Sequence, residues 1–142
     1  MIREHFQYRS TITTILAEQR DYIEAAEEAM IRARQEVEGV ISQDEFFKTT
    51  FDPYRPPDLD LTRTPQRMVS ASESAGVGPM AAVAGTIAWA GVEAMQEQGA
   101  EFGVIDNGGD IALISDRELH IGIYAGQSEL SGKMAFRLPP QE

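Results

Sequence analysis

The sequence predicts an α+β domain in which two helices pack on a mostly antiparallel sheet. Three patterns predict it: an alternating run over residues 5–16, an amphipathic helix over residues 21–40, and two apolar runs that flank Asn107-Gly108-Gly109. The chain has 142 residues, of which 42% are hydrophobic, which suffices for one core and not for two. We therefore expect a single domain over residues 1–142.

The N-terminal run predicts a pair of strands at or near the edge of the sheet. Aromatic and β-branched residues such as Phe6, Tyr8 and Ile12 alternate with more polar ones. Arg9 lies in this run. We expect it to be solvated or ion-paired, and contact with a ligand is the alternative.

The helix predicted over residues 21–40 has one apolar face and one charged face, because its apolar residues recur at three- and four-residue spacing. Asp21 is expected to cap its start, and Gly39 to lie near its end. Its glutamates, among them Glu27 and Glu36, are interpreted as a solvated face rather than a metal site.

A less regular region follows this helix. Residues 44–48 predict a short helical turn, and the prolines of residues 51–58 favour extended backbone. We interpret that segment as a rigid crossover that leads to residues 68–71, with a partner-binding proline motif as the alternative.

Charge and residue content exclude several classes of protein. The formal net charge of −11 argues against nucleic acid or an anionic membrane as a partner, since neutralising phosphates needs clustered Lys and Arg. The absence of cysteine excludes disulfides, thiol nucleophiles and thiolate metal sites. The first residues carry no apolar signal core, so we expect a cytoplasmic protein.

A glycine-rich turn, Gly76-Val77-Gly78-Pro79, is predicted to start the second helix. Its glycines permit positive φ and close approach, and Pro79 suits the first helical position. The turn amides and the first helical N–H groups would form a site for a phosphate or carboxylate. A tight strand-to-helix turn without a ligand is the alternative interpretation.

The second helix, over residues 80–96, is predicted to be buried. It is rich in alanine and contains Gly85 and Gly91, which indicates that a backbone or a flat ligand packs close to it; we favour packing on the sheet. Residues 74–92 carry no charge, but Pro79 and the glycines interrupt this stretch, and too little helix remains to cross a membrane. We therefore expect no membrane partner.

A second glycine turn joins residues 102–105 to residues 111–114. Asn107-Gly108-Gly109 is typical of a hairpin, which needs no ligand. Asp106 and Asp110 flank the turn, and their carboxylates would accept bonds from a ribose or base, or hold a hard cation. Solvated turn aspartates are the alternative interpretation.

Two more strands are predicted, at residues 118–125 as the third strand of a meander and at residues 134–138. His120 stands alone in the first of them, so the sequence predicts no hydrolase set. The second is followed directly by Pro139-Pro140, which suggests that partner strands are missing. The edge of such a sheet would be open to pairing with another chain.

Two motifs together resemble those of the ApbE superfamily, most closely its short, soluble branch. They are Gly-Pro-Met-Ala-Ala-Val-Ala-Gly at residues 78–85 and Val-Ile-Asp-Asn-Gly-Gly-Asp-Ile at residues 104–111. The resemblance runs from about Tyr8 to the end of the chain, and it implies an ApbE-like, T-fold-related architecture. It also implies that a C-terminal part is lacking, because the family normally continues into a Thr-Ser-Ser-Gly-like segment and a further acidic metal-ligand region.

Better-known ApbE proteins are magnesium-dependent enzymes that attach the FMN half of FAD to a threonine or serine of a target protein. The resemblance implies that Gly108, Gly109 and the helix start at Pro79 border a flavin-nucleotide site, with residues 84–86 beside it. The lysine usual in the helix motif is absent here, where the run is Val83-Ala84-Gly85-Thr86. A charge expected near the phosphates is therefore missing.

We accordingly expect a nucleotide-type small molecule, FAD or FMN, as the ligand, with Mg²⁺ at Asp106 and flavin or nucleotidyl transfer as the reaction. The alternative is a non-catalytic binding or assembly protein that forms homo-oligomers through an exposed sheet edge. The expected ligand contacts are Gly76, Gly78 and Thr86 on the phosphate side and Asn107, Gly108, Gly109 and Asp110 at the nucleotide edge.

Overall fold

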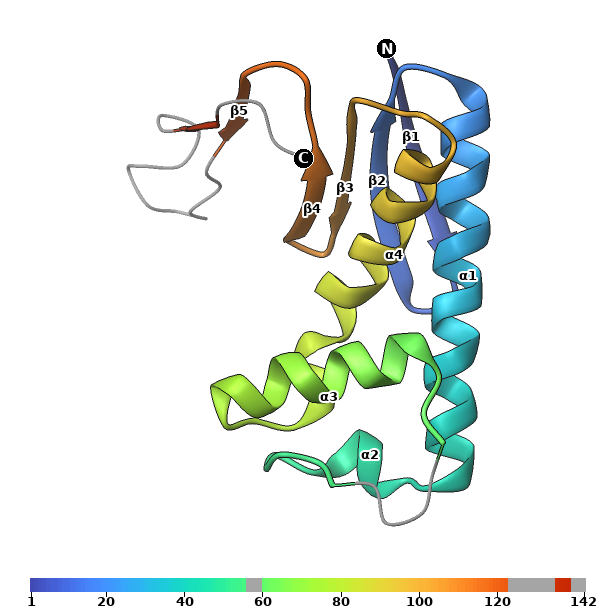
Figure 1. Cartoon of the computed structure of the whole chain (residues 1–142), viewed down its shortest axis with the longest axis vertical. Coiled ribbons are helices and arrows are strands. Elements are labelled where there is room, and N and C mark those ends of the chain that lie inside the picture. The colour runs from blue at the N-terminus through green and yellow to red at the C-terminus, as the bar shows by residue number, and fades with distance from the viewer. Residues whose placement is uncertain (56–59, 123–134, 139–142) are drawn as a thin grey trace.

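The computed structural model describes residues 1–55, 60–122 and 135–138 as helices packed on an antiparallel sheet (Figure 1). The strands are β1 (Ile2–Tyr8), β2 (Thr11–Ala17), β3 (Gly103–Asn107), β4 (Asp110–Ile114), β5 (Leu119–Gly122) and β6 (Ala135–Leu138). The helices are α1 (Arg20–Gln43), α2 (Phe46–Thr49), α3 (Arg63–Ala75), the 3₁₀ turn η1 (Pro79–Ala82) and α4 (Val83–Glu97).

The main sheet contains β1 to β4 in chain order, every pair antiparallel, and α1 and α4 cover one of its faces (Figure 1). β2 shows the alternation that this arrangement requires, because Thr11, Thr13, Ile15 and Ala17 are buried and the residues between them are more exposed. The predicted α+β class, the antiparallel sheet and the N-terminal strand pair at its edge are confirmed.

Two apolar clusters form the core, and α1 belongs to both. Ile23 and Met30 of α1 pack in one cluster with Ile105 of β3 and residues of α4. Further along the helix, Val37 packs in a second cluster with Phe47 of α2. α1 therefore connects the sheet to a helical lobe, made of α2, α3 and η1.

The extent of α1 differs from the prediction at both ends, although its apolar face is as predicted. Gln19 occupies the N-cap position without a side-chain bond, so Asp21 lies inside the first turn and does not cap the helix. The helix also continues through Gly39 to Gln43. Its next turn buries Val40, and this packing outweighs the small helix-breaking tendency of one glycine.

The predicted crossover over residues 51–58 leads to helix α3, which was not predicted from the sequence. Residues 68–71 lie in the middle of this helix, and Pro65 sits in its first turn, where a missing N–H costs nothing. Gly76 ends the helix in the left-handed conformation at φ 72° and ψ 26°. The glycine turn thus joins two helices and not a strand to a helix. Of the proline-rich segment, residues 56–59 lie outside the described residues.

The second helix starts at Pro79 as predicted, as the 3₁₀ turn η1 that passes into α4. A Cβ atom on Gly91 would lie 2.4 Å from the Ile105 side chain of β3, which confirms that this glycine permits close packing on the sheet. No single helix of the described chain is long and apolar enough to cross a membrane. α3 and residues 79–97 meet that test only as a pair, bent by 105°.

The predicted meander ends at β4. β5 exists, but it pairs with β6 in a separate two-stranded sheet instead of adding to β4. The last predicted strand is confirmed as β6, whereas residues 123–125 and 134 of the two predictions lie outside the described residues. Within the described part of the chain, β1 and β4 are therefore the edges of the main sheet.

Candidate functional site

The β3–β4 hairpin forms the predicted turn and leaves its surface open. Gly108 and Gly109 both have positive φ, at 63° and 103°, which the favoured two-residue hairpin turns require of their glycines. A Cβ atom added at either glycine would meet no atom within 4 Å. The turn therefore presents backbone groups without covering side chains.

Asn107 fixes this turn against the start of α4. The residue is 6% exposed, and its Nδ2 donates a hydrogen bond of 3.0 Å to the Ala84 carbonyl oxygen. A Cβ atom on Gly85 would lie 4.0 Å from the Cβ of Asp110. The structure thus brings four predicted nucleotide-edge residues, 107–110, next to the predicted helix residues Ala84 and Gly85.

The two turn aspartates point to opposite faces of the sheet. Asp110 is paired with Asn107 and shares its helix-covered face, whereas Asp106 is paired with Ile111 on the other face. Asp106 Oδ1 accepts a hydrogen bond of 2.9 Å from the Gly109 N–H. Among the described residues, no group of three or more His, Asp or Glu side chains could hold a metal ion. A cation at Asp106 would therefore need carbonyl or ligand oxygens as well.

The phosphate-side candidates lie away from the hairpin. Thr86 is buried, and it shares a helix face with Trp89 and Glu93, which contact Arg67 of α3. Gly76 is the left-handed end of α3. A Cβ atom on Gly78 would lie 2.0 Å from the Thr50 carbonyl oxygen, so this glycine serves a close approach of two backbone segments.

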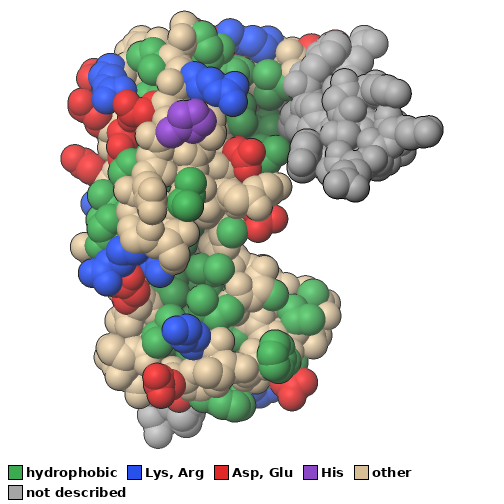
Figure 2. Space-filling model, turned by 180° about the vertical axis from the view of Figure 1, so that it is seen from behind, with side chains coloured by type: hydrophobic (Ala, Val, Ile, Leu, Met, Phe, Trp, Pro, Cys, Tyr) green, Lys and Arg blue, Asp and Glu red, His purple; other side chains and the backbone are tan. Residues whose placement is uncertain are grey.

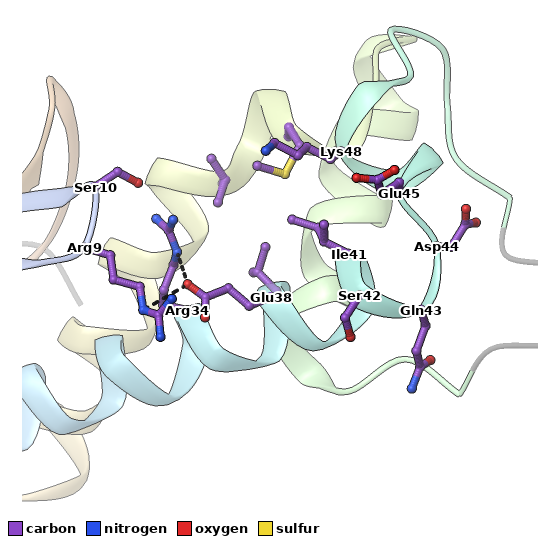
Figure 3. A pocket seen from close by; sticks show the side chains of 13 residues that line it. Arg9, Ser10, Arg34, Glu38, Ile41, Ser42, Gln43, Asp44, Glu45 and Lys48 are labelled. Atoms are coloured by element: carbon purple, nitrogen blue, oxygen red, sulfur yellow. Dashed lines mark hydrogen bonds and ion pairs between the residues drawn. The ribbon is translucent and has the colours of Figure 1, made fainter.

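A groove of about 980 Å³ lies where the sheet meets the helical lobe (Figure 3). The turn between β1 and β2 supplies Arg9 to one end, α1 supplies Arg34 and Glu38, and α2 supplies Lys48 across from them. Val83, the first residue of α4, also lines it. Of these residues the sequence pointed only to Arg9 as a ligand contact. Arg34 and Glu38 form an i,i+4 pair on α1, but no local pattern joins them to Lys48 or Val83.

Both hairpin turns of the main sheet lie at the end that faces the helical lobe, because Thr13 of β2 is paired with Asn107 of β3. Seen from behind, the surface is hollowed between this end of the sheet and the lobe (Figure 2). The glycine turn and the groove thus lie at the same end of the sheet.

Comparison with known proteins gives the family. A family model described as AbpE bacteria matches residues 2–142. The chain belongs to this family. It is also similar to UPF0280 proteins of Methanosphaerula palustris, 62% identical over 99% of the chain, and Methanoculleus marisnigri, 59% identical over 100% of it. The chain spans 59% and 58% of the lengths of these two relatives.

The chain also has a polar cluster between β1 and the N-terminal half of α1. Glu27 of α1 shares a hydrogen bond with Glu4 of β1, and Arg20 donates a hydrogen bond to Glu4. Burial and the bond to Glu4 raise the pKa of Glu27 to about 7. The bonds from Arg20 and Glu27 lower the pKa of Glu4. Below about pH 7 the two carboxyl groups therefore hold one proton between them.

The predicted solvated glutamate face is wrong for Glu27 and also for Glu36. The Glu36 Oε2 accepts a hydrogen bond of 2.9 Å from the Thr64 hydroxyl of α3, and the residue is half-buried. Helical spacing located these glutamates on one side of α1. It did not show that β1 and α3 cover parts of that side.

Proposed function

We propose that this chain forms a nucleotide site at the β3–β4 turn and that the whole protein is a magnesium-dependent flavin or nucleotidyl transferase. The hydrogen bond from Asn107 to Ala84 supports this best, because it holds a side-chain-free turn beside a helix start that is itself made of small residues. The chain spans about three-fifths of its relatives, so the activity is proposed for the longer protein.

The turn suits the flat ring or ribose of a nucleotide. Gly108 and Gly109 let a ligand approach the backbone without a steric barrier, and Asp110 on the same face would accept hydrogen bonds from ribose or ring N–H groups. Asp106 keeps its second carboxylate oxygen for Mg²⁺, which commonly uses one or two carboxylates together with substrate phosphates. Positioning and charge stabilisation at the diphosphate would provide most of the catalysis.

Calorimetric titration of the folded chain with FAD, FMN and ADP, with and without Mg²⁺, tests the proposal. Micromolar binding of FAD that Mg²⁺ strengthens would support a flavin transferase and justify a search for a Thr or Ser acceptor. Absence of heat with all three ligands, on a sample that circular dichroism shows to be folded, would contradict the nucleotide site.

Gly109→Ala is expected to weaken nucleotide binding, because the new methyl group and the strained φ both alter the ligand-facing turn. Gly99→Ala is the matched control. Gly99 has a similar φ of 97°, against 103° for Gly109, and a Cβ atom there also meets nothing within 4 Å. Each change should cost about 1–3 kcal/mol of stability, so equal loss of binding in both variants would indicate an effect of stability alone.

A non-catalytic assembly role is the second candidate, and the uncovered face of the sheet favours it. Ile12 of β2 is 60% exposed and Ile111 of β4 is 40% exposed, both on the face opposite α1 and α4. Sedimentation velocity that shows a concentration-dependent dimer, together with no nucleotide binding, would favour this candidate.

A further inference from the structure

One end of the groove beside α1, where Arg9 and Arg34 lie, carries more positive than negative charge. The Nε atoms of Arg9 and Arg34 lie 3.4 Å and 3.1 Å from the same Glu38 oxygen, so one carboxylate serves two guanidinium groups (Figure 3). The backbone N–H of Lys48 donates a hydrogen bond to the Glu45 carbonyl oxygen, whereas its side chain makes no hydrogen bond or ion pair with any described residue. The surplus at the end formed by Arg9 and Arg34 contrasts with the formal net charge of −11 of the whole chain.

The acidic residues of the groove lie mainly at its α2 end. Asp44 already accepts a hydrogen bond from the Phe46 N–H and another, of 2.6 Å, from the Tyr54 hydroxyl. Burial, and after it this hydrogen bond, raise the pKa of Tyr54 to about 12, so the phenol stays neutral. Glu45 lines the same end and is exposed. The end formed by Arg9 and Arg34 is therefore the one with uncompensated charge.

Arg9 occupies its position at a conformational cost. Among the described residues it is the one non-glycine with positive φ, at 55°. Left-handed backbone costs an arginine roughly 1–2 kcal/mol, whereas glycine adopts it freely. The Arg9 side chain is 60% exposed, so its ion pair with Glu38 stabilises the fold by less than this conformational cost. The guanidinium also lies 5.6 Å from the centroid of the Tyr8 ring, a contact worth about 0.5–1 kcal/mol. Together these exposed contacts roughly offset the conformational cost and do not exceed it.

The middle of the groove is apolar. Val37 is fully buried beneath it, and Ile41, Met80 and Val83 are partly buried along it. The volume of about 980 Å³ falls at the upper end of the range for small-molecule pockets. An apolar surface with two arginines at one end suits a ligand that has an oxyanion at one end and an apolar body.

We propose that this groove binds a small amphipathic anion, a phosphate or carboxylate carried on an apolar body. The oxyanion contacts Arg9 and Arg34, and the body lies over Ile41, Met80 and Val83. Lys48 raises the local positive potential from the opposite wall. This site is separate from the glycine turn, and it stands whether or not the turn binds a nucleotide.

Octyl phosphate, octanoate and octanol are the probes, titrated into the folded chain by calorimetry at two salt concentrations. We expect at least one of the two anions to bind and octanol not to bind, with weaker binding at higher salt. If only one of the two anions binds, it identifies the oxyanion. The proposal would be overturned if octanol bound as tightly as the anions, or if neither anion bound.

Two variants separate binding from folding. Arg9→Gly is expected to weaken anion binding roughly tenfold, the effect of losing one charged hydrogen bond, while its melting temperature stays the same or rises. Lys48→Gln is expected to weaken binding less. Arg32→Gln is the control and should leave anion binding unchanged, because Arg32 lies on α1 like Arg34 but outside the groove.

Unchanged affinity in both Arg9→Gly and Lys48→Gln would overturn the assignment of the site. The Gly109→Ala variant distinguishes this proposal from the nucleotide site. It should bind the anion like the wild-type chain, because the turn does not line the groove.

Discussion

Gly78→Ala is expected to lower the free energy of unfolding by about 3 kcal/mol, at the upper end of the usual cost of overpacking. The new Cβ atom would lie 2.0 Å from the Thr50 carbonyl oxygen and 2.9 Å from its carbonyl carbon. These are backbone atoms of the segment that follows α2, so no side-chain rotation relieves the clash. Urea denaturation followed by circular dichroism measures the loss.

Gly91→Ala is the matched control for Gly78→Ala. Its Cβ atom would also lie closer than 3 Å to a neighbour, but that neighbour is the end of the Ile105 side chain. The helix also gains about 1 kcal/mol from replacing an interior glycine. We expect a stability within about 1 kcal/mol of the wild type. Equal losses in the two variants would contradict the backbone contact between Gly78 and Thr50.

Glu27→Gln is expected to remove a fall in stability that the wild-type protein shows as pH rises. The pKa of Glu27 is raised from 4.5 to about 7 by folding, so the folded state binds more protons than the unfolded state between these pH values. The stabilisation is present in full below about pH 4.5 and is lost as pH rises through 7. Because Glu27 is partly exposed, solvent screening reduces the stabilisation that corresponds to this pKa shift to about 1–2 kcal/mol.

Unfolding free energies at pH 5.5 and pH 8 test this expectation. The variant should match or exceed the wild type at pH 8, because a neutral amide replaces a carboxylate that is costly to ionise beside Glu4. Glu28→Gln is the control, since Glu28 is exposed on the same helix. A wild-type stability that rises between these pH values would contradict the shared proton of Glu4 and Glu27.

Local patterns predicted the parts of the fold that depend on local chemistry. The sequence Asn107-Gly108-Gly109 predicted the β3–β4 turn, because few residue types adopt positive φ at two adjacent positions. α1 followed from the spacing of its apolar residues. Close packing at Gly91 followed from the cost of a glycine inside a helix.

The sequence did not reveal α3, because three of its four buried residues are of types that seldom mark a core. Thr64, Pro65, Met68 and Ser72 recur at helical spacing, yet only Met68 is strongly apolar. The groove was missed for a different reason. Its cations come from the β1–β2 turn, α1 and α2, and only the tertiary fold places Arg34 and Lys48 on facing walls.

The order of strands in the sheet has a consequence for synthesis of the chain. β2 pairs with β3 across residues 18–102, which include α1 and the whole helical lobe. The first hairpin and α1 are therefore available long before β3 leaves the ribosome, and until then β2 remains an open edge. Pairing between such distant segments is slow, so the nascent chain exposes the unpaired backbone edge of β2 throughout the translation of the lobe.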